Sequence, residues 1–259
     1  MFTLINAVIF GAFIGAALIG DIVAARHFPK MKGWRVRGIL MAALFIAVST
    51  YAPFLWVSWL GAVQLLDLGA WPILAQIVVG YAALQFCAYW WHRALHKSDT
   101  LWRLFHQMHH SVERMDGWGA LYHHPLDVIA FTFVGSFALT VIGGMAPKAV
   151  LVVNMIGLAA VLFTHANIKT PQWIGVIFQR PEGHGIHHQR DNHAGNYGEL
   201  AVWDIVFGTW KNPKAWNGEA GFSDGASARI GEMLMGRDIS SEAAPQADRE
   251  RRPSRQSLA

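Results

Sequence analysis

The chain has 259 residues and a formal net charge of +4; 53% of its residues are hydrophobic and only 15% are charged. A typical soluble domain carries about 25% charged residues, so this composition is too apolar for that class. No nucleic-acid motif accompanies the basic charge, which is better explained by loops that face anionic lipid headgroups.

Five segments contain no Asp, Glu, Lys or Arg, and each is close to the roughly 20 residues that a membrane-spanning helix needs. The first lacks a basic leader and a small-residue cleavage pattern, so it is predicted to be a retained helix rather than a signal peptide. The expected fold class is all-α, an integral, multi-pass membrane bundle with five crossings. In chain order the segments are Phe2–Gly20, Gly38–Leu66, Leu68–Trp91, Val128–Pro147 and Ala149–Ile168.

The basic residues predict the orientation of the bundle, because Lys and Arg in short loops stay on the cytoplasmic side. The turn around Asp67 has no Lys or Arg, and the turn after Gly143 has only Lys148. Both turns are therefore expected outside the cytoplasm, and a cytosolic histidine-rich cap is expected at the opposite end. The loop after the first segment contains five basic residues: Arg26, Lys30, Lys32, Arg35 and Arg37.

Three short histidine clusters follow apolar segments, at residues 92–96, 106–110 and 184–188. The first has the spacing HxxxH, which puts two imidazoles on one helix face. The other two share the spacing HxxHH, although Pro181, Gly183 and Gly185 indicate a looser turn in the last. Imidazole is a suitable ligand for iron, copper, nickel and zinc. The cluster histidines are His92, His96, His106, His109, His110, His184, His187 and His188.

Other residues bear on the number of ligands and metal ions in the site. His165, deep in an apolar segment, and His124 are further candidate ligands, since such a histidine is costly without a partner. His123 and His193 lie beside the clusters but outside their spacing, so their ligation stays open. Because four to six donors fill one coordination sphere, these histidines imply two metals. The single cysteine, Cys87, excludes a site of several thiolates.

Four acidic residues near the clusters are predicted to orient imidazole N–H groups rather than to bind metal. They are Glu182, Asp191, Glu199 and Asp204.

The strings HRALH, HQMHH, HANI and HGIHH, followed by NYG and WDIVFGTW, resemble the fatty acid hydroxylase/sterol desaturase superfamily of membrane di-iron enzymes. The resemblance covers residues 80–212, with N-terminal transmembrane helices at 1–79 and a polar tail, predicted to be disordered, at 213–259. His124 matches a position that only some members share, and Gly185 stands where many members have Arg. The ligands that the resemblance implies are His92, His96, His106, His109, His110, His165, His184, His187 and His188.

The resemblance implies a catalytic centre of two iron ions that uses O2 to hydroxylate or desaturate a lipid. No haem-binding, flavin or nicotinamide motif is present, so the electrons are expected from a separate ferredoxin or cytochrome b5 type donor with its reductase. Nothing in the chain chooses the lipid. Two other classes compete: a histidine-rich membrane metal transporter or metal-binding protein, and a bis-imidazole haem protein, which needs isolated histidines on paired helices.

Overall fold

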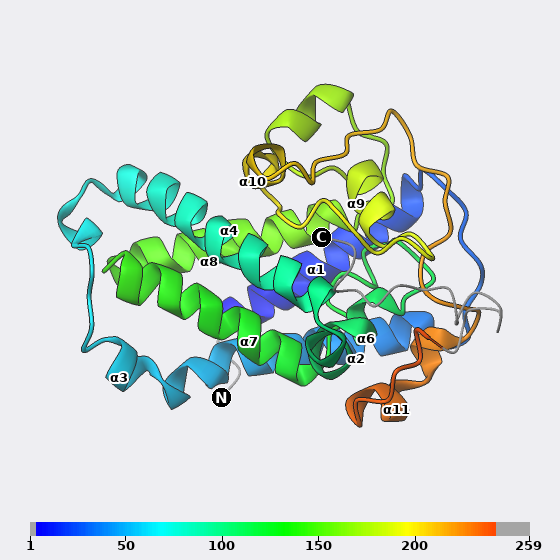
Figure 1. The fold of residues 1–259 in the computed structure, drawn as a ribbon, viewed down its shortest axis with the longest axis horizontal. Coiled ribbons are helices and arrows are strands. Elements are labelled where there is room, and N and C mark those ends of the chain that lie inside the picture. The colour runs from blue at the N-terminus through cyan, green and yellow to red at the C-terminus, as the bar shows by residue number, and fades with distance from the viewer. Residues whose placement is uncertain (1–3, 242–259) are drawn as a thin grey trace.

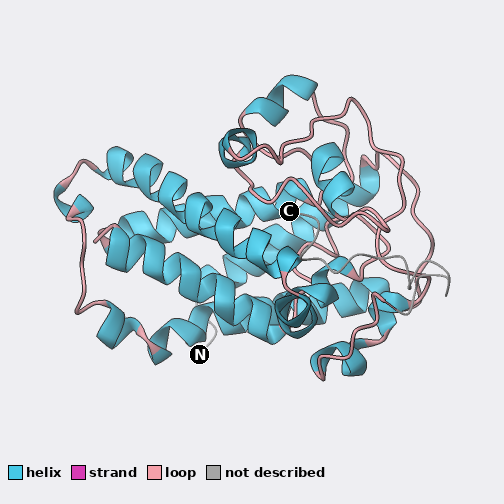
Figure 2. Cartoon of the chain, in the orientation of Figure 1, coloured by secondary structure: helices cyan, strands magenta, loops and turns pink. Residues whose placement is uncertain are grey.

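The computed structural model describes residues 4–241, and within this range the regular elements are helices, with two isolated β-bridges and no strand (Figure 2). Five helical segments are long and apolar enough to cross a membrane, which confirms the predicted all-α bundle and agrees in number with the five predicted segments. They are α1 (Leu4–Ile22), α2 (Trp34–Tyr51) with its extension η1 (Ala52–Leu55), α4 (Ile73–Lys97), α7 (Pro125–Ser136) with the π-helical η4 (Phe137–Ile142), and α8 (Pro147–Thr164).

The five segments lie side by side along the long axis of the molecule (Figure 1). Helix α4 packs against both α7 and α8, and α2 packs against α1 and α7. Pro125 and Pro147 begin α7 and α8 at the first helical turn, where a proline costs no hydrogen bond. Large apolar side chains such as Leu74 and Val78 are exposed on the outside of the bundle, as expected of a surface that faces lipid.

One end of the bundle is formed by two turns that pair with each other. Leu65 donates its backbone N–H to Val141 O at 2.7 Å, and Gly69 donates to Gly144 O at 3.0 Å. This end also holds α3 (Val57–Leu60) and η2 (Leu68–Ala70). The two turns that are poor in Lys and Arg therefore lie together.

The opposite end carries a head of short helices and loops, together with the basic loop between α1 and α2 (Figure 1). Arg26 in that loop donates to the backbone carbonyl of Gly218 in the head at 2.9 Å. The elements of the head are α5 (Asp99–Leu101), the π-helical η3 (Trp102–His106), α6 (Gln107–His110), η5 (Gln172–Val176), α9 (Pro181–His187), α10 (Ala201–Val206), η6 (Ala226–Ala228) and α11 (Ile230–Leu234).

The chain beyond residue 212 differs from the predicted disordered tail. Phe222, Met233 and Ile239 are buried in the same apolar core as Trp102, and the Trp102 indole donates to Ser240 Oγ at 3.2 Å. Residues 213–241 thus form an ordered strap across the head, because scattered apolar side chains anchor an otherwise polar segment. Residues 242–259 of the predicted tail lie outside the described range.

The strap also explains the glycine at position 185. A Cβ atom built on Gly185 would come within 2.4 Å of the Trp216 ring. The Trp216 ring packs over this turn of α9, so a side chain at position 185 has no room.

Candidate metal centre

Nine buried histidines meet at the head in two groups. In each group, one ring nitrogen from every member lies within 4.8 Å of those of all the others. The first histidine group is His92, His96, His106, His110 and His187, and the second histidine group is His109, His165, His184 and His188.

The two HxxHH strings are divided between the groups in opposite ways. In the string on η3 and α6, the outer pair His106 and His110 joins the first histidine group and His109 the second. On α9 and its C-cap, His187 joins the first group, whereas His184 and His188 join the second. Helix α4 serves only the first group and the end of α8 only the second. Each string therefore bridges both groups.

One loop, residues 193–197, fixes the ring orientation of three members of the first histidine group. Backbone carbonyls only accept hydrogen bonds, so each ring donates from Nδ1 and turns Nε2 inward. His193, Gly195 and Asn196 have positive φ values of 42°, 76° and 53°, which bend the loop. The Nδ1–O pairs are His92 with Tyr197 at 2.7 Å, His96 with His193 at 2.7 Å and His187 with Gly195 at 2.6 Å.

A buried carboxylate orients a fourth ring. Asp127 Oδ2 lies 2.9 Å from His106 Nδ1 and 2.8 Å from His123 Nδ1. The His123 ring stacks on that of His109, with centroids 4.0 Å apart and planes at 11°. Asp127 thus links the first group to His123, which packs against the second.

The donor geometry fits a bound cation. Among the rings whose Nδ1 donates, His92 Nε2 lies 2.9 Å from His106 Nε2 and 3.3 Å from His96 Nε2. Each of these Nε2 atoms carries a lone pair, and the lone pairs face one another. They repel unless a positive charge lies between them. Nitrogens bound at about 2.0–2.1 Å to one ion are themselves separated by about 3 Å. Within the described part of the chain, the buried His110 Nε2 and His187 Nε2 have no hydrogen-bond partner.

Burial lowers the pKa of several imidazoles of the head and so favours their neutral form, the form that binds metal. Loss of water lowers the pKa of His165 to about 3. The same cause, followed by repulsion from neighbouring imidazoles, holds the pKa of further members well below the ordinary range. These are His109, His110, His184, His187 and His188.

Three of the four acidic residues expected to orient imidazoles bond other groups instead. Asp191 lies in an exposed turn with a φ of 65°, and Glu182 accepts from the backbone and hydroxyl of Thr170 at 2.8 and 2.7 Å. Asp204 accepts from the backbone N–H groups of Tyr197 and Gly198 at 2.8 Å, so it supports the loop rather than a ring. Glu199 bonds Gln85. The predicted role was wrong for Glu182, Glu199 and Asp204.

Sequence reasoning missed Asp127 because that residue precedes an apolar segment, outside the histidine strings. Its local signal was the HxxxD spacing from His123, but His123 precedes the N-cap of α7, so the contact depends on the turn before the helix and not on helical periodicity.

The remaining histidines lie around the groups. His124 is outside both; its Nδ1 accepts from Leu126 N at 3.1 Å and caps α7, which differs from the predicted ligand role. His193 Nδ1 lies 3.0 Å from His110 Nδ1, so it contacts the first group from outside.

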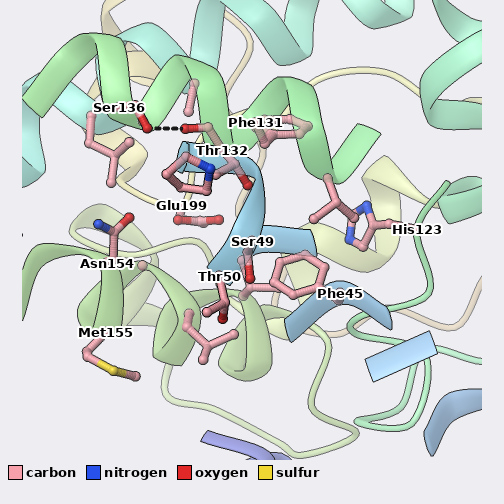
Figure 3. Close-up of a pocket in the computed structure, with 18 of the residues that line it drawn as sticks. Phe45, Ser49, Thr50, His123, Phe131, Thr132, Ser136, Asn154, Met155 and Glu199 are labelled. Atoms are coloured by element: carbon pink, nitrogen blue, oxygen red, sulfur yellow. Dashed lines mark hydrogen bonds between the residues drawn. The ribbon is translucent and has the colours of Figure 1, made fainter. Parts of the chain in front are cut away.

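An apolar cavity of about 650 Å³ extends from the histidines into the bundle. Side chains of all five membrane segments line it, and His92, His106 and His184 are at its head. Figure 3 shows Phe45 and Phe131 at its wall, with the Glu199 carboxylate among polar side chains. Its size and lining suit a hydrocarbon chain whose C–H bonds reach the imidazoles.

Comparisons with known proteins agree with this arrangement. The chain is 33% identical to an ornithine lipid hydroxylase of Rhizobium tropici, over 55% of the chain and 44% of that protein. It is 28% identical to a very-long-chain aldehyde decarbonylase of Oryza sativa, over 67% of the chain and 69% of the relative. A sphingolipid C4-hydroxylase of Schizosaccharomyces pombe is 27% identical, over 49% and 45% respectively.

The chain thus spans less than half the length of the first and third of these relatives. No solved structure matches it. A family model described as fatty acid hydroxylase matches residues 77–209, a range that contains both histidine groups. The chain belongs to the fatty acid hydroxylase family.

Proposed function

We propose that this multi-pass membrane protein is a di-iron oxygenase that hydroxylates, or desaturates, a lipid with O2. Its electrons would come from a separate ferredoxin or cytochrome b5 type donor with its reductase. The observation that carries the proposal is the position of two buried imidazole groups at the head of an apolar cavity. The relatives named as lipid hydroxylases support the same chemistry.

The first histidine group would hold one iron ion and the second histidine group the other. Iron supplies the redox chemistry that oxygen activation requires, which no amino-acid side chain provides. The loop 193–197 keeps each Nδ1 proton on a carbonyl and each Nε2 directed inward. Asp127 accepts a hydrogen bond from Nδ1–H of His106 and so holds that ring in the same tautomer.

The cavity has two tasks in this proposal. Its apolar wall holds the lipid chain so that one C–H bond lies at the imidazoles, and it keeps bulk water away from them. Histidines gathered at one end of the bundle, rather than across the middle of the membrane segments, argue against a metal transporter.

The test combines metal analysis with lipid mass spectrometry. Anaerobically purified protein should hold about two iron ions per chain, and cells with the gene should contain a lipid shifted by one oxygen or by two hydrogens. His187→Ala should abolish that product and lower the iron content while membrane abundance is kept, whereas His27→Ala should change neither. Iron near zero, or product formation by the His187 variant, would overturn the proposal.

We further propose that the head lies in the cytoplasm. The basic loop, which contacts the head through Arg26, supports this orientation. Reporter fusions after residue 67 and after residue 259 should report opposite compartments, with the cytoplasmic signal at the latter. A cytoplasmic signal at residue 67 would contradict the orientation.

A further inference from the structure

The carboxyl group of Glu199 faces the cavity, at the level of the membrane segments. Gln85 on α4 donates from Nε2 to Glu199 Oε2, and both residues line the cavity. Gln85 lies seven residues, two helical turns, before His92, which is about 10 Å along the helix axis. Figure 3 shows the Glu199 carboxylate projecting into the space near Thr132 and Asn154.

The Gln85 side chain forms its hydrogen bonds with Glu199 and Leu200. Its Oε1 accepts from the backbone N–H groups of Glu199 and Leu200 at 3.1 and 3.4 Å, which fixes the start of α10. Its Nε2 donates a hydrogen bond to Oε2 of the Glu199 carboxyl group. Among the described residues, no hydrogen bond is formed by Glu199 Oε1, which faces the cavity.

Three other polar side chains of the cavity donate hydrogen bonds within their own helices, and Thr50 Oγ1 on α2 donates to Asn6 Oδ1 on α1 at 3.2 Å. Ser136 donates to Thr132 O at 2.9 Å, Asn154 to Val150 O at 2.9 Å and Ser49 to Ile46 O at 3.3 Å. Such local bonds make polar side chains compatible with an apolar wall. Glu199 differs from these side chains, because it carries a carboxyl group and comes from the head loop.

An unpaired carboxylate away from water is costly, and burial raises the pKa of Glu199 to about 7. The Gln85 bond offsets this only in part. A donor brought in by a ligand would complete the shell of the carboxyl group, and hydrogen bonds to a charged group contribute about 1.5–3 kcal/mol.

We propose that Glu199, held by Gln85, is a recognition site for a hydrogen-bond donor, a hydroxyl or amino group, on the lipid that occupies the cavity. The inference rests on the proposed function, of which it specifies the substrate class: a lipid with a donor group two helical turns from His92, rather than a plain hydrocarbon chain. Glu199 is here a specificity-determining residue.

The test is equilibrium binding of three radiolabelled probes of equal chain length, 1-hexadecanol, hexadecylamine and 1-methoxyhexadecane, to the full-length protein in detergent micelles. The wild-type protein should bind at least one of the two donors about 10- to 100-fold more tightly than the methyl ether, which cannot donate. Glu199→Leu should reduce this ratio to about one while ether binding is kept. Glu219→Gln, at a side chain that is 74% exposed, is the matched control and should change nothing.

Glu199→Gln separates the two donors, because an amide still accepts a hydrogen bond but carries no charge. Loss of the amine preference alone identifies an ammonium ligand, and a retained hydroxyl preference identifies a neutral one. If Glu199→Leu fails to bind the ether, Glu199→Met, which keeps the length of the side chain, replaces it in the comparison.

No donor preference in the wild-type protein, or an undiminished preference in Glu199→Leu, would overturn the inference. Binding needs no turnover, so this result is independent of iron content and product formation. A donor preference without any oxygenated lipid would leave the recognition site standing and remove the proposed function. The reverse combination would remove only the recognition site.

Discussion

At the scale of single residues, Asp127 joins parts of the head that the chain keeps far apart. One carboxylate oxygen accepts from two imidazoles, His106 of the first histidine group and His123, which stacks on the second. It is fully buried on the first turn of α7. An imidazole held in this way keeps its tautomer and its basicity, so the carboxylate is expected to raise the metal affinity of the first histidine group through His106.

Asp127→Asn is therefore expected to weaken metal binding about 10- to 100-fold. The amide keeps the shape of the side chain but can present its NH2 group to the rings and allow the wrong tautomer. Competition with a chelator measures the affinity. Asp224→Asn, at a side chain that is 98% exposed, is the control. An unchanged affinity in Asp127→Asn would show that the contact has no role in holding the rings.

Glu199 predicts a pH dependence of stability. Its pKa is raised from an ordinary value of 4.5 to about 7 in the folded protein. Between these values the folded state keeps the proton and the unfolded state has lost it. Stability therefore falls as the pH rises through this window, by at most about 3 kcal/mol. Glu199→Gln should remove that fall, so its unfolding midpoint in detergent should exceed that of the wild type by more at pH 8 than at pH 5. An equal difference at both pH values would contradict the shift.

At the scale of elements, the strap of residues 213–241 packs against Trp102, and Trp102 covers one side of the first histidine group. The Trp102 ring centroid lies 5.1 Å from that of His96 and 5.0 Å from that of His110. Met233 and Ile239 of the strap are buried in the core that contains Trp102. The strap therefore keeps water from one side of the imidazoles.

Two methionines of the strap test this role. Met233 is fully buried, whereas Met235 is 79% exposed. Met233→Ala should lower the free energy of unfolding by about 2–5 kcal/mol, because it leaves a cavity beside Trp102. Met235→Ala should change it by less than about 0.5 kcal/mol. Equal effects of the two substitutions would mean that the strap does not pack as described.

Much of this arrangement could be predicted from the sequence, and the failures have physical causes. Charge-free segments identify membrane helices because the membrane tolerates few alternatives, and HxxHH spacing identifies candidate ligands. The division of each string between two groups depends on how α6 and α9 face each other, which no local pattern records. The strap was missed because its anchors, such as Phe222 and Met233, are few and the segment has no long apolar run.

At the scale of the molecule, the two ends of the bundle differ in character. One end is a pair of short turns closed by backbone hydrogen bonds, and the other is the metal-binding head (Figure 1). The cavity joins the head to the membrane interior, so a lipid can reach the imidazoles without leaving an apolar environment.

The opposite division of the two HxxHH strings affects how metal enters. An ion bound by the first histidine group would fix α6 and α9, and these helices would then present His109, His184 and His188 to a second ion. The second ion should thus bind to a site that is already ordered, which is positive cooperativity. Anaerobic iron titration followed by native mass spectrometry measures this coupling. At half saturation, two independent equal sites would leave half of the molecules singly loaded, and the singly loaded fraction should stay far below that value. A binomial distribution would exclude the coupling. All-or-none loading means that scarcity of iron in a cell would reduce the number of competent molecules and leave the rate of each unaltered.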